Sequence, residues 1–155
     1  MAELITNGGF TGNANGWTLN GGDTLFIYNN NLIYCEDSGA NLNSYAQQDL
    51  SGLITSGDYS ISVDVVADGS VGSSVFIRVG IQNQNGFLGT APYISETVLK
   101  GESRTLTASF TYPGYDGVPE VLTIDVQCTG TTVHCDVDNV SLAGPLAPLF
   151  KARST

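Results

Sequence analysis

Positive charge is scarce in this sequence. Its 155 residues include five Lys and Arg against fifteen Asp and Glu, which gives a formal net charge of −10. The acidic residues are scattered along the chain instead of forming a block, and this distribution is typical of a solvated acidic surface. No basic patch is available to neutralise a row of phosphates, so we do not expect a nucleic-acid partner.

Long apolar runs and targeting signals are missing as well. No stretch approaches the roughly 20 apolar residues that cross a bilayer, so we expect no membrane insertion. Met1-Ala2-Glu3 leads directly into a strand-like segment, without the basic and apolar regions of a secretory signal. We therefore expect a protein that is assembled in a cytoplasm; the alternative is a secreted protein whose signal has been removed.

The residues of common catalytic sites are few. His134 is the single histidine, and it falls on an outward position of an alternating strand. There is no glycine-rich phosphate loop between a strand and a helix, and no Cys/His cluster with zinc spacing. Fifteen acids leave open a carboxylate pair with glycosidase spacing. We nevertheless expect a protein that is not an enzyme.

Three cysteines are an odd number, so at least one thiol stays unpaired within the chain. Residues 121–142, VLTIDVQCTGTTVHCDVDNVSL, alternate on both sides of a Thr/Gly turn, which predicts an antiparallel hairpin with Cys128 opposite Cys135. The two side chains then form a disulfide or pack as small buried thiols, and we expect them reduced in a cytoplasm. The apolar positions shift by one residue further on, which predicts a β-bulge near Asp138-Asn139.

What the chain does contain is glycine and a two-residue alternation of apolar and polar side chains. About ten short strands with regularly spaced turns, and no helical periodicity, predict an all-β fold: an antiparallel two-sheet β-sandwich. The expected strands are residues 3–5, 24–28, 32–35, 45–50, 58–66, 75–81, 93–98, 104–111 and the two halves of 121–142. The expected core is Tyr59, Ile61, Val63, Val65, Val75, Ile77, Val79, Leu106, Phe110, Ile124, Val126 and Val137.

The alternation stops after Leu142. The segment AGPLAPLFKARST contains two prolines and two of the five cations, and proline keeps such a segment extended and out of central strands. We therefore divide the chain into a sandwich domain, residues 1–142, and an extended C-terminal arm, residues 143–155. We expect the arm to bind a partner through Leu146, Leu149 and Phe150 as apolar anchors, with Lys151 and Arg153 as a polar clamp.

Several segments resemble carbohydrate-binding modules of the family 4/9/22 type. They are ELITNGGF at residues 3–10, the following Gly16-Trp17, QDLSGLITSGDYSISVDVVA at residues 48–67 and DVDNVSL at residues 136–142. The resemblance covers nearly everything except the arm, and it implies a jelly roll with Trp17 in the core. Its motifs are mostly structural, so they are more specific for the fold than for sugar binding.

Modules of this family often carry a structural calcium ion between the first loop and the closing strand. The resemblance implies carboxylate ligands directly after NGGF and in the closing strand, because calcium prefers oxygen ligands. Here Thr11 stands at the first position, while Asp138 and Asp136 match the second. We therefore expect no firmly bound cofactor; the alternative is a structural calcium ion at a site that Thr11 weakens.

Modules of this fold also bind glycans on a sheet face or at loop ends, with aromatic rings for stacking and Gln, Asn and Arg for hydrogen bonding. Phe76, Arg78 and Gln82 project from one face of the strand at 75–81, and Phe87 follows in the next loop. The resemblance makes these four residues the candidate glycan site. The alternative is that a neighbouring element or subunit covers Phe76.

Stand-alone modules of this type resemble decoration or cement proteins of tailed-phage capsids and receptor-contacting domains of phage tails. This resemblance implies a non-catalytic virion surface protein that the arm docks onto other capsid or tail proteins. We expect a homo-oligomer, with a trimer favoured. The alternative is a glycan-binding module that recognises a cell-surface or plant polysaccharide.

Overall fold

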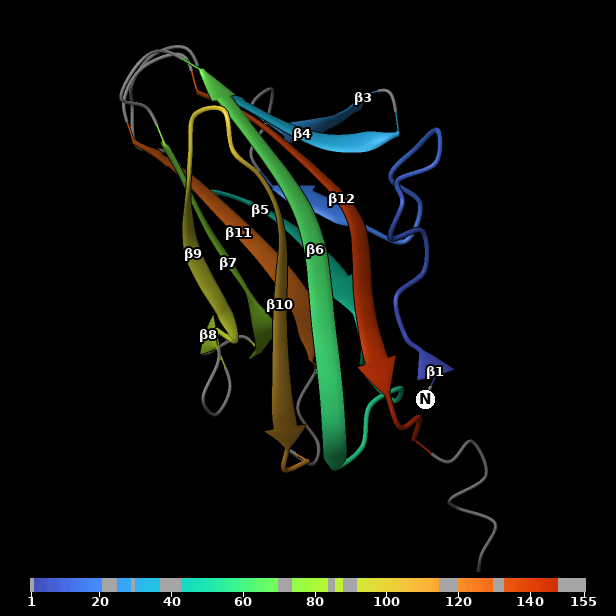
Figure 1. Cartoon of the computed structure of the whole chain (residues 1–155). Coiled ribbons are helices and arrows are strands. Elements are labelled where there is room, and N and C mark those ends of the chain that lie inside the picture. The colour runs from blue at the N-terminus through green and yellow to red at the C-terminus, as the bar shows by residue number, and fades with distance from the viewer. Residues whose placement is uncertain are drawn as a thin grey trace, which may run out of the picture.

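The computed structural model describes residues 2–20, 25–28, 30–36, 43–69, 74–83, 86–87, 92–114, 120–129 and 133–147. These residues form two antiparallel sheets that pack face to face, with β10, β6 and β12 in the front layer of Figure 1 and β7, β11 and β5 behind them. The predicted two-sheet β-sandwich with the jelly-roll fold is therefore confirmed. Within the described ranges, no helix is long and apolar enough to cross a membrane.

The front layer, sheet A, has the order β10-β6-β12-β4-β3, and β1 pairs with β12 as well. Its strands are β1 (Ala2–Glu3), β3 (Leu25–Tyr28), β4 (Asn31–Glu36), β6 (Gly57–Gly69), β10 (Ser103–Tyr112) and β12 (Val133–Gly144). The back layer, sheet B, has the order β2-β5-β11-β7-β8, and β9 also pairs with β7. Its strands are β2 (Thr18–Asn20), β5 (Asn43–Asp49), β7 (Ser74–Asn83), β8 (Gly86–Phe87), β9 (Ile94–Leu99) and β11 (Val121–Thr129).

The core lies between the two sheets, because each long strand turns its alternate apolar residues toward the other sheet. Of the predicted core, Phe110 is only partly buried. Trp17 is 8% exposed, and its indole Nε1 donates a hydrogen bond to the backbone oxygen of Asn7. The remaining predicted core residues are 4% exposed or less: Tyr59, Ile61, Val63, Val65, Val75, Ile77, Val79, Leu106, Ile124, Val126 and Val137.

The predicted hairpin at residues 121–142 is wrong. β11 lies in sheet B between β5 and β7, whereas β12 lies in sheet A between β6 and β4. The chain therefore crosses from one sheet to the other where we expected a turn within one sheet. The alternation correctly predicts which side chains face inward. It does not indicate which sheet a strand belongs to, because the inner faces of both sheets pack against the same core.

The cysteines are consequently not cross-strand neighbours. Cys128 lies opposite Val75 in sheet B, and Cys135 lies opposite Tyr34 and Ala67 in sheet A. Cys135 is a fully buried free thiol, and burial raises its pKa far above the ordinary value. The side chain of Cys128 lies outside the described residues.

The predicted bulge in the closing strand is confirmed. The register of β12 against β6 shifts between Asp138 and Ser141, and Asn139 has a φ of 50°. Asparagine tolerates this left-handed conformation better than most residues. Past the bulge, Val140 and Leu142 face the core again, with exposures of 4% and 0%.

The expected boundary at residue 142 falls inside β12, which continues to Gly144 and pairs there with β1. The start of the arm is attached to the domain: Leu146 forms a β-bridge with Ile54, and the Ala147 N–H donates to the Leu53 carbonyl at 2.8 Å. Leu146 is 52% exposed. The other four predicted arm contacts, Leu149, Phe150, Lys151 and Arg153, lie outside the described residues.

Candidate functional site

The outer face of sheet B carries the residues that the sequence suggested for glycan binding. β7 turns Val75, Ile77, Val79 and Ile81 into the core, where each is fully buried. The intervening positions therefore face outward. They are Phe76, Arg78, Gly80 and Gln82. Phe87 on β8 lies opposite Gln82 in the register, although its side chain is outside the described residues.

The sheet order adds neighbours that the sequence alone did not indicate. β11 places Asp125 opposite Arg78, and β5 places Tyr45 opposite Asp125. On the other side of β7, Ser95 of β9 lies opposite Arg78. Tyr45 is 36% exposed and is therefore a second aromatic ring on this face. The sequence indicated that Tyr45 faces outward, because it lies at an outward position of an alternating strand. It did not indicate how close Tyr45 lies to β7, because that depends on the order of the strands in the sheet.

The middle of this face carries small residues that are covered by their neighbours. Gly80 has no side chain, and the adjacent Thr123 is 3% exposed. Gln47 covers Thr123, and its amide Nε2 donates to the Thr123 hydroxyl at 3.2 Å. Gly80 is itself buried, so ligand contacts on this face fall to the larger side chains on either side along β7.

Two further observations describe the chemistry of the face. The guanidinium carbon of Arg78 lies 6.0 Å from the ring centroid of Phe76, at the limit of a cation–π contact. The side-chain oxygen of Gln82 is buried and accepts no hydrogen bond from any described residue. A buried acceptor without a donor is costly, so this amide oxygen is a place where a bound hydroxyl group would be stabilised.

The residues expected to bind calcium lie elsewhere, on the outer face of sheet A. Asp136 and Asp138 alternate with the buried Cys135 and Val137 of β12, whereas Thr11 is exposed in the first loop. The Asp138 oxygen Oδ1 is buried without a hydrogen-bond partner among the described residues, which suits a cation. However, no three His, Cys, Asp or Glu side chains in the described part of the chain gather into a metal site.

Comparison with known proteins identifies the family of this chain. The family model described as "Carbohydrate binding domain" matches residues 2–130. The chain belongs to this family. No curated protein sequence matches the chain.

Solved structures support the same assignment at the level of the fold. TmCBM61, solved in complex with β-1,4-galactotriose, has a TM-score of 0.61 at 12% identity, over 94% of this chain and 100% of that one. The N-terminal cellulose-binding domain of Cellulomonas fimi β-1,4-glucanase C has a TM-score of 0.55 at 19% identity, over 84% and 89%. Tailspike protein 4 of bacteriophage CBA120 has a TM-score of 0.59 at 14% identity, over 93% of this chain and 21% of that one.

Proposed function

We propose that this carbohydrate-binding module binds a glycan, without catalysis, on the outer face of sheet B. The observation that carries the proposal is the row of Phe76, Arg78 and Gln82 along β7, within a fold whose family model is a carbohydrate binding domain. These residues supply an aromatic ring, a guanidinium group and an amide side by side. Sugars present apolar C–H faces and many hydroxyl groups, and this combination is complementary to both.

The aromatic rings define the direction of a bound chain. Phe76 and Tyr45 lie on strands that are separated by β11, roughly 10 Å apart across the sheet. An oligosaccharide that crosses the strands obliquely therefore meets both rings and passes over β11 between them. This geometry supports binding of several consecutive sugar units instead of a single unit.

Polar side chains along the same path provide hydrogen bonds. The guanidinium group of Arg78 supplies several N–H donors in one plane. The amide oxygen of Gln82 has no hydrogen-bond donor among the described residues, and a sugar hydroxyl would supply one. Among the described residues, the acidic positions Asp49 and Asp125 and the cation Arg78 share this face. We therefore propose that the ligand is an uncharged cell-surface or plant polysaccharide.

The decisive experiment is a glycan-array screen followed by calorimetric titration of the best ligand. Phe76→Ala should weaken binding by about tenfold or more, because burying a phenylalanine side chain contributes roughly 1.5–3 kcal/mol. Tyr28→Ala is the matched control, since Tyr28 is 64% exposed but belongs to sheet A. Equal affinities of the wild type and Phe76→Ala would place the site elsewhere, and no binding to any glycan would refute the proposal.

A second candidate function is docking onto a virion, where the arm holds the module on other capsid or tail proteins. The likeness to a domain of a phage tailspike protein favours it. The attachment of the arm to the domain also favours this function. The Tyr59 hydroxyl donates a hydrogen bond to the Pro145 carbonyl at 2.6 Å, and the next residue, Leu146, forms a β-bridge with Ile54. These contacts give the arm a defined starting direction at one end of the sandwich.

Truncation after Ala147 tests this second function. The shortened protein keeps the contacts of Pro145 and Leu146 with the domain, so its melting temperature should remain unchanged. It loses Leu149, Phe150, Lys151 and Arg153, so it should no longer form a homo-oligomer or join a particle. A truncated protein that assembles like the full chain would refute the docking role and leave glycan binding untouched.

A further inference from the structure

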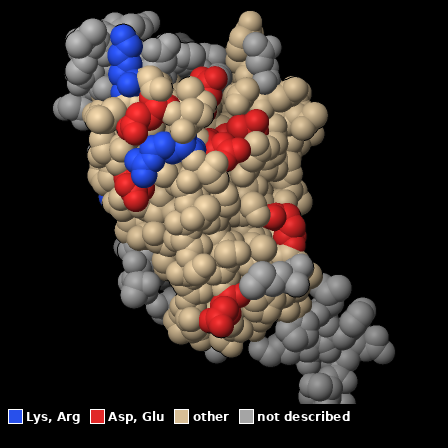
Figure 2. Space-filling view, viewed as in Figure 1, with Lys and Arg blue, Asp and Glu red and all other residues tan. Residues whose placement is uncertain are grey.

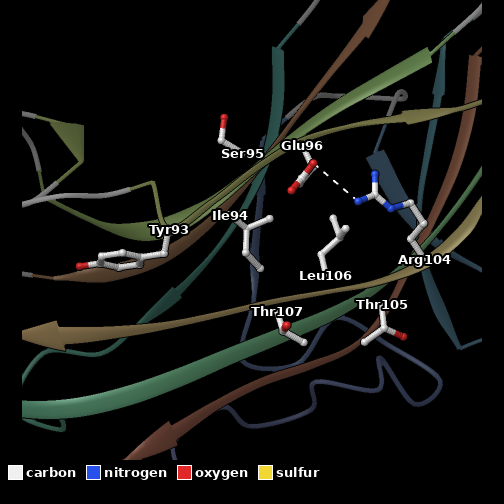
Figure 3. Close-up of a pocket in the computed structure, with 8 residues that line it drawn as sticks. All are labelled: Tyr93, Ile94, Ser95, Glu96, Arg104, Thr105, Leu106 and Thr107. Carbon is white, nitrogen blue, oxygen red and sulfur yellow. Dashed lines mark ion pairs between the residues drawn. The ribbon is translucent and has the colours of Figure 1, made fainter.

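The two sheets meet along their edge strands, β9 of sheet B and β10 of sheet A, which run side by side in Figure 1. Between them lies a cleft of about 360 Å³. Figure 3 shows its lining, with charged side chains at one end and the Tyr93 ring at the other. This volume falls within the range of roughly 300–1,000 Å³ that is usual for small-molecule sites.

The charged residues of the cleft occupy core-facing positions of the two edge strands. Glu96 lies opposite Ile77, and Arg104 lies opposite Val65, both of which are at most 1% exposed. In a central strand these side chains would be buried in the core. At the sheet edges they extend into the opening between the layers instead, and remain 48% and 35% exposed.

These two side chains have unused hydrogen-bonding capacity. A carboxylate oxygen of Glu96 lies 3.6 Å from Nη2 of Arg104, which is longer than a hydrogen bond. Arg104 donates from Nη1 to the backbone oxygen of Thr97 at 3.2 Å. The Glu96 carboxylate accepts no hydrogen bond within the described part of the chain, so its lone pairs face the cleft or solvent.

The rest of the cleft has buried aliphatic residues at its base and an aromatic ring at its far end. Ile94 and Leu106 form the base, with exposures of 3% and 4%. Tyr93 stacks on Phe110 at a centroid distance of 3.6 Å and an interplanar angle of 4°. The cleft is therefore bounded by an ion pair at one end and by stacked rings at the other.

We propose that this cleft is a second binding site, which takes one neutral sugar ring, either a monosaccharide or the terminal unit of a glycan. The opposite charges of Glu96 and Arg104 offset each other, and in Figure 2 basic side chains on this face lie beside acidic ones. A net charge on the ligand would therefore add little to its binding affinity. Adjacent hydroxyls of one ring donate to the carboxylate and accept from the guanidinium.

This site is separate from the outer face of sheet B. Ser95 points to the outer face beside Arg78, whereas Ile94 and Glu96 on the same strand point into the cleft. The long outer face admits a chain, whereas the small volume of the cleft suits one unit. The proposal therefore does not depend on the outer face being a glycan site.

The test is to titrate isotope-labelled protein with glucose, galactose, mannose, xylose and N-acetylglucosamine. The backbone amide signals are monitored by NMR during each titration. At least one sugar should shift the signals of residues 93–96 and 104–107. Glu96→Gln, which keeps the shape but removes the charge, should weaken this binding by about tenfold. Glu102→Gln is the matched control, because Glu102 lies in the adjacent turn, outside the cleft, where its Oε1 accepts from the Leu99 N–H. It should bind like the wild type.

Phe76→Ala separates the two sites. Shifts in the cleft that persist in Phe76→Ala and weaken in Glu96→Gln support the proposal. The proposal is overturned if none of the sugars shifts the cleft signals, or if Glu96→Gln binds as tightly as the wild type. Shifts confined to residues on the outer face of sheet B would overturn the cleft site while leaving the proposed function intact.

Discussion

Glu120 illustrates what a single buried group contributes. It is 7% exposed, and the hydroxyl of Tyr112 donates a hydrogen bond to its Oε2. Its backbone is tied to the neighbouring loop as well, since its carbonyl accepts from the Leu50 N–H and its own N–H donates to the Ser51 hydroxyl. Burial removes water from the carboxylate and raises the pKa of Glu120 above its ordinary value of 4.5.

The raised pKa makes the free energy of unfolding depend on pH. The folded protein holds the Glu120 proton more tightly than the unfolded chain, so this group's stabilising contribution is complete below pH 4.5 and is lost as pH rises toward the folded pKa. Glu120→Gln cannot ionise and keeps an acceptor for Tyr112. Relative to the wild type, this variant should therefore gain stability in urea denaturation as pH rises from about 4.5 toward neutral. A constant difference across this range would contradict the assignment.

At the scale of elements, the first loop is fastened to the bulge of β12. The Val140 N–H donates to the Gly8 carbonyl at 3.0 Å, directly after the left-handed Asn139. The same loop is held from sheet B by the side chain of Gln48, which accepts from the Thr6 N–H and donates to the Thr6 carbonyl. The NGGF motif thus connects both sheets, and this explains why it appears as a structural signature of the fold.

Gly8→Ala tests this connection. A Cβ at residue 8 would overlap the backbone oxygen of Val140, which cannot move without breaking the contact between loop and bulge. We expect a loss of roughly 1–3 kcal/mol in the free energy of unfolding by urea denaturation. Gly9→Ala is the control, because its Cβ would meet nothing closer than the Thr11 hydroxyl oxygen at 3.7 Å. Equal stabilities of the two variants would show that the loop adjusts freely.

At the scale of the whole molecule, two rigid sheets present separate surfaces for different contacts. The outer face of sheet B is broad and crosses several strands, whereas the cleft between β9 and β10 lies at the junction of the layers. The arm starts near the loop that carries Leu53 and Ile54. A sandwich with its contacts on distinct surfaces can bind a glycan and a protein partner at the same time.

Calcium should add little to the stability of the whole domain. The described residues gather no cluster of three acidic, histidine or cysteine side chains, and Asp138 supplies only one buried oxygen without a partner. For a weak site with a Kd of about 1 mM, 10 mM calcium would stabilise the fold by about 1.4 kcal/mol. We therefore expect calcium to raise the melting temperature of the wild type slightly. It should not raise the melting temperature of Asp138→Asn. A fall in melting temperature when trace calcium is chelated would reveal a tight site instead.

The sequence by itself determined the class of fold and the inward residues. The alternations around Ile61 in β6 and Ile77 in β7 hold whichever strands lie beside them, because neighbouring side chains of a strand point to opposite faces. The outward placement of Phe76, Arg78 and Gln82 follows from the same rule. The bulge at Asp138-Asn139 was also predictable, because only an extra residue returns Val140 and Leu142 to the core face.

Only the tertiary structure decided which strands are neighbours. The link between β11 and β12 is long enough either to turn within one sheet or to cross to the other about 10 Å away, and the local pattern is the same in both cases. The pairing of Cys128 with Cys135 was therefore wrong, and Tyr45 on the outer face was missed. Glu96 and Arg104 meet for the same reason: β9 and β10 are edges of different sheets, a property of the assembled layers that no local sequence pattern encodes.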